Sequence, residues 1–396
     1  MTSAINNLAG ASQFVLQSAI TGYSDEAYTN AKKLSGTGIV TGDSPDINKD
    51  TETFTGQLRW FKPLTPVINI ASLTDSTAGD LTDFGSEFAQ YVKTVRTHGA
   101  RKINLQSVVS QEDGLAKIGR DFGETRAQDE HDVLLALLKG VAVAEVFHGA
   151  GSAGGATGLG GQTFDNDPTD KKYGFYVDLG SAKPVVAASA SIQGAARAEG
   201  FLTAFATAYK DYEPEYAYLV TSPEVFASLR SANLVDSTKV SDGNIEFETI
   251  FGGKFRLIQT RASQGLSTAQ LAKVNTGAGV DVIGTKTSFI VLPEALALVQ
   301  LDIPEPVEIT RVGGAYKGGG TTEIWHRWGY VAHPKGYNWK GLDNAFPGNG
   351  NYMQVKDGAS APVDLTAVTV TANTTGVWER KVNSALSLSI LPVFHS

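Results

Sequence analysis

The longest regular pattern in the chain is a helical one that runs from Leu115 to Phe147. Leucine and valine recur along it at the i, i+3, i+4, i+7 spacing of one helix face, at Leu134, Leu137, Leu138 and Val141. At 1.5 Å per residue such a helix spans about 50 Å, which exceeds the length of most helices in compact domains. A helix of this length predicts surface that a single chain leaves poorly buried.

Glycine interrupts this helix at positions 119, 123 and 140, which predicts a bend or a break, and a tract from Gly149 to Gly161 ends it. The letters from 149 to 154 match the dinucleotide fingerprint. That fingerprint needs a strand before it and a helix after it, whereas here a helix precedes and more glycine follows. The tract also resembles a nucleophile elbow around Ser152, but Ala150 stands where that motif needs glycine. We therefore interpret the tract as a flexible linker.

Composition excludes several classes of protein. The 396 residues include no cysteine, so disulfides, thiolate nucleophiles and zinc sites with sulfur ligands are excluded. The formal net charge of −8 argues against a general nucleic-acid binder, which usually shows a basic stripe. The apolar runs are all shorter than the ~18 residues that a membrane span needs, so no membrane partner is predicted.

The first part of the chain predicts an arm followed by a hairpin. Residues 1–53 are polar and have no sustained period, so we expect an extended arm that is either mobile or ordered by lying on another surface. Two β-like stretches follow, at 54–70 and 91–109, and residues 97–100 are predicted to form a turn. The second stretch is basic and has no helix to cover it, which predicts a projecting loop.

The remainder predicts helices and strands in mixed order. A helix with Phe201 and Phe205 on one face precedes a short strand, and Ser222 and Pro223 are the cap and first residue of another helix. Because the order is not strictly βαβ, we expect the α+β class. The predicted strands cover residues 216–220, 254–260, 280–283, 288–292, 307–312, 322–332, 365–371 and 386–393.

No set of residues predicts a catalytic or metal site. His326 and His333 lie seven residues apart on a predicted strand, so they point to opposite faces. Glu323 and His326 lie three residues apart, so they too point to opposite faces and do not form a metal site. The acidic run 129–132 lies within the long helix and is typical of a solvated face. We therefore predict no enzyme activity, no cofactor and no metal.

Aromatic residues are concentrated near the end of the predicted strand 322–332. Such a cluster could form a sugar-binding platform, but aromatic residues also build domain cores and subunit contacts. Basic neighbours such as Arg327 and Lys335 favour an interface anchor. The cluster consists of Trp325, Trp328, Tyr330, Tyr337 and Trp339.

The order of these elements resembles the major capsid protein of tailed double-stranded-DNA bacteriophages, the Hong Kong ninety-seven type fold. Four stretches carry the resemblance, at 114–147, 221–229, 251–258 and 325–336. The resemblance implies an N-terminal arm at 1–53 and an extended β-hairpin, the E-loop, at 54–112. It further implies a peripheral domain with the spine helix and the glycine-rich loop at 113–190, an axial domain at 191–312, and a return to the peripheral domain with the C-terminal segment at 313–396.

The resemblance also implies a function. A protein of this family self-assembles into pentamers and hexamers that form the icosahedral shell of the virion, assembled in the cytoplasm of the host bacterium. The shell encloses DNA without sequence-specific binding, and a separate scaffolding protein, a portal and decoration proteins are the implied partners. An encapsulin-type nanocompartment shell protein is the nearest alternative, and a carbohydrate-binding module or an enzyme is a remote one.

Contacts between neighbouring subunits are expected at the basic hairpin and at the aromatic cluster. We expect the hairpin to lie over an adjacent subunit and meet acidic surface there, and charge reversal at Arg59 and Arg96 to block assembly while the monomer stays folded. The candidate interface residues are Arg59, Trp60, Lys62, Lys93, Arg96, Arg101, Trp325, Arg327 and Trp328.

Overall fold

The structure is a computed structural model of the full chain. Lys62, the glycine tract 149–161 and the predicted strand 280–283 lie outside the residues that it describes. Among the described residues, no helix is both long enough and apolar enough to cross a membrane. The described residues are 17–29, 31, 34–42, 47–61, 86–103, 114–148, 174–178, 193–209, 214–236, 239–242, 245–260, 286–312, 320–358, 360–365, 367–368, 374–381 and 388–395.

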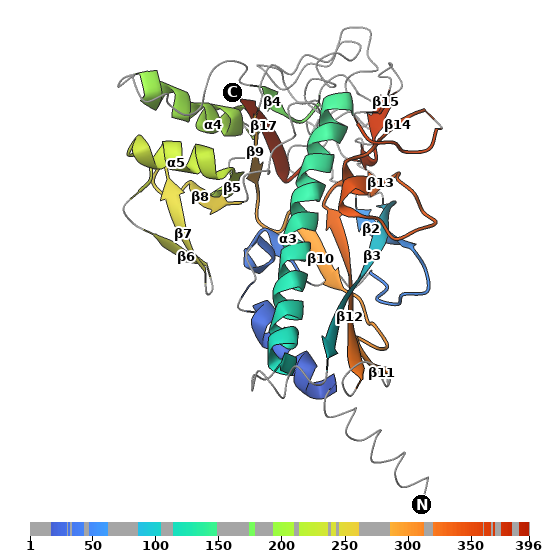
Figure 1. Ribbon diagram of the computed structural model, residues 1–396. Helices are drawn as coiled ribbons and strands as arrows, with labels where there is room; N and C mark the ends of the chain where they lie inside the picture. Colours follow the sequence, from blue (N-terminus) through green and yellow to red (C-terminus); the bar gives the residue numbers. More distant parts are fainter. Residues whose placement is uncertain are drawn as a thin grey trace, which may run out of the picture.

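The predicted long helix is confirmed as α3, which runs without a break over 35 residues, Gly114–His148. Figure 1 shows it between two sheets, with one sheet on either side. From residue 133 to residue 147 nearly every side chain of α3 is buried. A helix that is buried all round forms the centre of a core rather than its surface, so α3 is the element on which both sheets pack.

The glycines within α3 allow close packing and do not interrupt the helix, which corrects the predicted break. A Cβ atom at Gly123 would lie 2.2 Å from the backbone oxygen of Ser24, and one at Gly140 would lie 2.1 Å from the backbone oxygen of Tyr352. No carbon atom fits at these distances. Glycine is therefore required where other segments of backbone cross the helix.

A seven-stranded sheet lies on one side of α3, in the order β4-β17-β9-β5-β8-β7-β6. Strand β5 pairs in parallel with β8 and antiparallel with β9. Helices α4 (Gln193–Ala208) and α5 (Pro223–Ser231) belong to this half, and Ser222 caps α5 as predicted. The strands are β4 (Val177–Asp178), β5 (Ala217–Thr221), β6 (Val240–Asp242), β7 (Ile245–Ile250), β8 (Phe255–Gln259), β9 (Lys286–Val291) and β17 (Ile390–His395).

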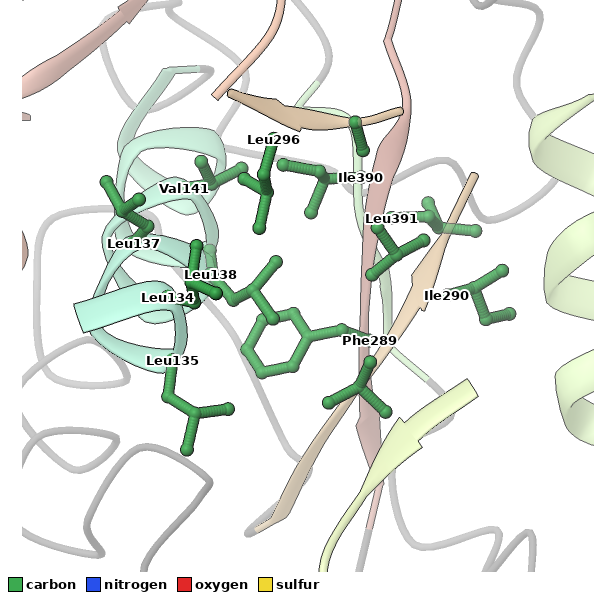
Figure 2. Close-up of a cluster of buried hydrophobic side chains, with 14 of the residues drawn as sticks. Leu134, Leu135, Leu137, Leu138, Val141, Phe289, Ile290, Leu296, Ile390 and Leu391 are labelled. Carbon is green, nitrogen blue, oxygen red and sulfur yellow. The ribbon is translucent and has the colours of Figure 1, made fainter. Parts of the chain in front are cut away.

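The predicted leucine face of α3 contacts this sheet. In Figure 2, Leu134 and Leu138 of α3 face the side chains of Phe289 on β9 and Ile390 on β17. These four side chains are fully buried. Burial of a side chain of this size contributes roughly 1.5–3 kcal/mol, so this contact is a main source of stability for the junction of α3 and the sheet.

A six-stranded sheet lies on the other side of α3, in the order β1-β10-β12-β3-β2, with β11 also paired to β12. Its strands are β1 (Val40–Thr41), β2 (Thr55–Phe61), β3 (Ser86–Ile103), β10 (Leu296–Gln300), β11 (Val307–Val312) and β12 (Thr321–Pro334). The smaller elements are η1 (Leu34–Gly36), η2 (Asn349–Met353), and the pairs β13 (Tyr337–Trp339) with β16 (Trp378–Arg380) and β14 (Val355–Asp357) with β15 (Thr374–Gly376).

The hairpin differs from its prediction, because residues 97–100 form no turn. Strand β3 is continuous through them, and it pairs first with β2 and then with β12. Gly99 lies opposite Trp325, whose ring occupies the space of a side chain at position 99, 2.7 Å from where a Cβ atom would be. The glycine that indicated a turn therefore makes room for an aromatic ring on the neighbouring strand.

The two sheets do not follow the predicted domain boundaries, which stay a prediction. Strands β10 and β11 fall in the predicted 191–312 unit but join the six-stranded sheet, and β17 falls in the predicted 313–396 unit but joins the seven-stranded sheet. The chain changes sheet between β9 and β10, where Glu294 has a positive φ of 56°. No strand forms among the described residues of the predicted strand 365–371.

Residues 17–29 are helical, whereas the sequence predicted an arm without regular structure. Ile20, Ser24 and Tyr28 form the buried stripe of this helix, which packs on α3 at Gly123. The helix was not predicted because Ser24, a polar residue, lies within the buried stripe. The stripe therefore lacks the repeated apolar spacing by which a helix is recognised in a sequence. The sequence analysis allowed an arm that is ordered by lying on another surface. Residues 17–29 are ordered in this way, and the surface is α3 of the same chain.

Candidate functional site: the interaction surface

The end of the β2–β3 ribbon exposes an aromatic side chain. Phe88 is 53% exposed, and the guanidinium of Arg59, which is also exposed, lies 5.4 Å from the centre of its ring. Residues 86–92 of β3 pair with β2 and not with β12. A two-stranded ribbon is only marginally stable in water by itself, so this end is suited to contact another surface. The backbone of Trp60 lies in β2.

Lys93 does not belong to the exposed ribbon, which corrects its predicted place on an uncovered basic face. Its side chain is fully buried, and its Nζ donates hydrogen bonds to the backbone oxygen of Asp50 at 2.7 Å, to Asp50 Oδ1 at 2.8 Å and to Thr53 Oγ1 at 3.0 Å. The hydrogen bond from Lys93 is the main cause that lowers the pKa of the Asp50 carboxyl. Lys93 therefore fixes residues 50–53 to the sheet.

Arg96, which the sequence placed on an uncovered basic face, is also engaged within the chain. It donates to the backbone oxygen of Pro347 at 2.7 Å and to Asn349 Oδ1 at 3.0 Å, and its Nε lies 3.5 Å from Asp129 Oδ1. These contacts join β3, α3 and the loop before η2. Arg96 therefore acts in folding, and any contact with a neighbouring subunit stays a prediction.

Two further candidate cations, Arg101 on β3 and Arg327 on β12, border the open face of β12. Arg101 is 63% exposed and donates to Glu323 from both Nε and Nη2, and Arg327 is paired with Glu308. Trp325 lies between Glu323 and Arg327 in β12 and is 42% exposed. This face presents one aromatic ring bordered by two ion pairs. Surface pairs of this kind contribute little to stability, so they are available to rearrange on contact with a partner.

Trp328 faces the opposite side of β12 and is buried, so it does not join Trp325 on the open face. Its Nε1 donates to Asp129 Oδ2 at 3.1 Å, and the hydroxyl of Tyr330 donates to the same atom at 2.6 Å. Burial, followed by the nearby Asp129 carboxylate, raises the pKa of Tyr330. Tyr337 and Trp339 are buried as well, so four of the five clustered aromatic residues build the core.

The acidic run of α3 is not the solvated face that the sequence predicted. Asp129 accepts the two hydrogen bonds just described, and Glu130 is fully buried. Glu130 accepts from the hydroxyl of Tyr28 at 2.6 Å and from Gln300 at 2.8 Å. Donors from distant parts of the chain satisfy these carboxylates. The sequence gives no sign of them, because the partners come from the N-terminal helix and the six-stranded sheet.

A second buried carboxylate lies near the end of α3. Glu145 accepts from Arg380 Nη1 at 2.8 Å, from the hydroxyl of Tyr337 at 2.9 Å and from the backbone nitrogen of Phe175 at 2.6 Å. Both charged side chains are almost completely buried. Burial, followed by the nearby Glu145 carboxylate, raises the pKa of Tyr337, so this hydroxyl remains a donor. This cluster ties α3 to β13, to β16 and to the segment beyond the glycine tract.

The two strand histidines have separate surroundings, as their spacing predicted. Phe122 stacks on His326, and Trp378 contacts His333. Burial is the main cause that lowers the pKa of each imidazole to about 4. Among the described residues, no group of three or more His, Asp or Glu side chains is arranged to hold a metal ion.

Comparisons with known proteins find similarity in structure only. No protein-family model matches the chain, and no curated protein matches it in sequence. The head structure of Helicobacter pylori bacteriophage KHP40 matches with a TM-score of 0.47 and 9% identity over 92% of this chain and 91% of that chain. The capsid of Ralstonia phage GP4 matches with a TM-score of 0.45 and 14% identity over 77% and 85% of the two chains.

A third match is the capsid structure of cyanophage P-SCSP1u, with a TM-score of 0.43 and 9% identity over 90% of this chain and 86% of that chain. The α+β class is confirmed by the two sheets and the helices described above. The three solved structures to which this chain is similar are described as two phage capsids and one phage head.

Proposed function

We propose that this chain is the major capsid protein of a tailed double-stranded-DNA bacteriophage and that copies of it assemble into the icosahedral shell. The observation that carries the proposal is the exposed end of the β2–β3 ribbon, where Phe88 and Arg59 face solvent. An aromatic ring with a neighbouring arginine is typical of the residues that dominate protein interfaces. A second copy of the chain is the partner that such a ribbon needs.

Trp325 provides a complementary surface. Its exposed ring is bordered by Glu323 and Glu308, so the open face of β12 offers one aromatic contact and two carboxylates to an incoming arginine and phenylalanine. The ribbon of one copy and the β12 face of the next are different surfaces. Contacts between different surfaces of identical chains close into rings when the rotation permits, which supports pentamers and hexamers.

The proposal includes the virion as the location of the protein and the host cytoplasm as the place of assembly. A scaffolding protein, a portal and decoration proteins are the proposed partners. The net charge of −8 supports a shell that does not bind the enclosed DNA tightly, and we propose that it makes no sequence-specific contact with this DNA. The sugar-binding alternative gains no support, because only Trp325 among the five clustered aromatic residues is exposed. The encapsulin alternative rests on no observation of its own.

Replacement of the exposed pair, with Arg59→Glu and Phe88→Ser in one chain, is expected to abolish shells and leave the monomer folded. The charge reversal repels the carboxylates proposed as partners, and the serine removes most of the apolar contact. Electron microscopy counts the shells, and circular dichroism checks the fold. Val363→Ser, at a side chain that is 39% exposed, is the matched control and is expected to assemble.

Normal shells from the double variant would overturn the proposed contact. The Arg96 charge reversal predicted from the sequence is unsuitable for this test, because Arg96 holds the loop before η2. A carboxylate at position 96 would lie beside Asp129 and destabilise the monomer itself.

A further inference from the structure

Two histidines lie opposite each other on neighbouring strands, next to a ring of α3 that contacts the N-terminal helix. His98 on β3 and His326 on β12 are directly opposite in the strand register. The ring of Phe122 on α3 lies 5.3 Å from both imidazoles, edge-on to His98 and stacked on His326. Trp328 lies 5.2 Å from His326. An imidazole that can carry a proton is thus held among aromatic rings.

Helix 17–29 packs on this cluster. Ile20 belongs to the same buried group as Phe122, together with Ile324 of β12. Gln17 Nε2 donates to the backbone oxygen of Val307 at 3.1 Å, so the start of the helix is fixed to β11. Departure of the helix would open this group to water.

The charges around His326 disfavour a proton on it. His326 Nδ1 is buried and has no hydrogen-bond partner among the described residues. Arg126 and His98 both lower the pKa of His326 in addition to burial. The carboxylates of this region are engaged elsewhere: Asp121 lies 3.5 Å from His98, and Glu130 and Asp25 lie 3.6 and 3.9 Å from Arg126. The ionisable groups that face this region from β3, α3 and helix 17–29 are His98, Asp121, Arg126, Glu130 and Asp25.

Arg126 connects the histidine to the helix. Its guanidinium lies 4.1 Å from the centre of the Tyr28 ring, and Tyr28 is one of the buried residues of helix 17–29. A proton on His326 would place a second positive charge near the same guanidinium in a buried region. Undocking of the helix relieves this repulsion, because it lets water reach both groups.

We propose that His326 makes the docking of helix 17–29 on α3 dependent on pH, so that protonation of this side chain releases the helix. Burial lowers the pKa of His326 from 6.5 to about 4 in the docked state, and an open state in which water reaches the imidazole returns this pKa toward its ordinary value. Docking is therefore strongest at neutral pH and weakens as pH falls from 6.5 toward 4. At pH 5 the opening equilibrium is expected to rise about 30-fold. This pH dependence of docking is a property of one chain and does not depend on shell assembly.

The natural chain has no cysteine, which allows a direct test. A thiol introduced by Ser24→Cys lies on the buried stripe, where Ser24 is 1% exposed, and Ala19→Cys provides an exposed reference on the same helix. Each thiol is allowed to react with 4,4′-dithiodipyridine at pH 7.5 and at pH 5. The rate for Ser24→Cys divided by the rate for Ala19→Cys reports how often the helix opens. We expect this ratio to rise about 30-fold at pH 5.

Two histidine variants test whether His326 causes the rise in this ratio. In the Ser24→Cys background, His326→Phe keeps an aromatic ring beside Phe122 and is expected to remove the rise. His333→Phe is the matched control, because His333 is equally buried but contacts Trp378 instead, and the rise is expected to persist. If circular dichroism shows that His326→Phe does not fold at pH 7.5, His326→Gln replaces it. A flat ratio in the parent chain, or a rise that survives loss of His326, would overturn the proposal.

Discussion

Replacement of Glu145 by alanine is expected to lower the free energy of unfolding by about 3–5 kcal/mol, because it leaves the buried guanidinium of Arg380 without its charge partner. The hydroxyl of Tyr337 and the backbone nitrogen of Phe175 lose their acceptor at the same time. Buried donors without acceptors add to the cost. Urea unfolding, followed by tryptophan fluorescence, measures the change.

Glu379→Ala is the matched control for this prediction. Glu379 also faces basic side chains, Lys340 and Lys381, but it is 43% exposed. Its loss is expected to cost no more than about 1 kcal/mol. The double variant Glu145→Leu with Arg380→Met is expected to recover much of the lost stability, since it removes both buried charges. Equal losses for Glu145→Ala and Glu379→Ala would contradict the role given to the buried cluster.

The addition of a single methyl group to α3 is expected to have opposite results at two kinds of glycine. Gly140→Ala is expected to destabilise the fold by about 1–3 kcal/mol or more, because the new Cβ would lie 2.1 Å from the backbone oxygen of Tyr352 and 2.9 Å from the Trp378 ring. That oxygen is backbone, so it yields only if η2 moves away from the helix. Thermal unfolding by differential scanning calorimetry measures the change.

Gly22→Ala serves as the control, at a glycine in helix 17–29 where a Cβ atom meets nothing within 4 Å. Alanine is there expected to stabilise the helix by up to about 1 kcal/mol through its higher helix propensity. Changes of opposite sign in the stability of the two variants would distinguish the effect of close packing at Gly140 from the effect of helix propensity at Gly22. A stabilising effect of Gly140→Ala would contradict the close contact between η2 and α3 at Gly140.

The elements that depend on local pattern could be predicted. The leucine spacing gave α3 to within one residue at each end, and Ser222 with Pro223 gave the start of α5. Both signals arise from neighbouring residues on one element. The strand at 307–312 was predicted at its observed bounds for the same reason.

Partners that are distant in sequence could not be predicted. Lys93 looked like an exposed base because Asp50 reaches it from a segment without regular structure. Asp129 looked solvated because its donors Trp328 and Tyr330 lie about two hundred residues away. The continuous strand through Gly99 depends on the ring of Trp325, which no local rule places there. Pairing across the six-stranded sheet therefore decided which candidate interface residues stay exposed.

Sedimentation velocity of the purified chain over a range of protein concentration and ionic strength, with electron microscopy of each fraction, tests the central claim most directly. Closed rings and shells made of many 41.9 kDa subunits are expected, with assembly lost when Arg59 and Phe88 are replaced. A single 41.9 kDa species under every condition, with the ribbon end unchanged in exposure, would contradict it.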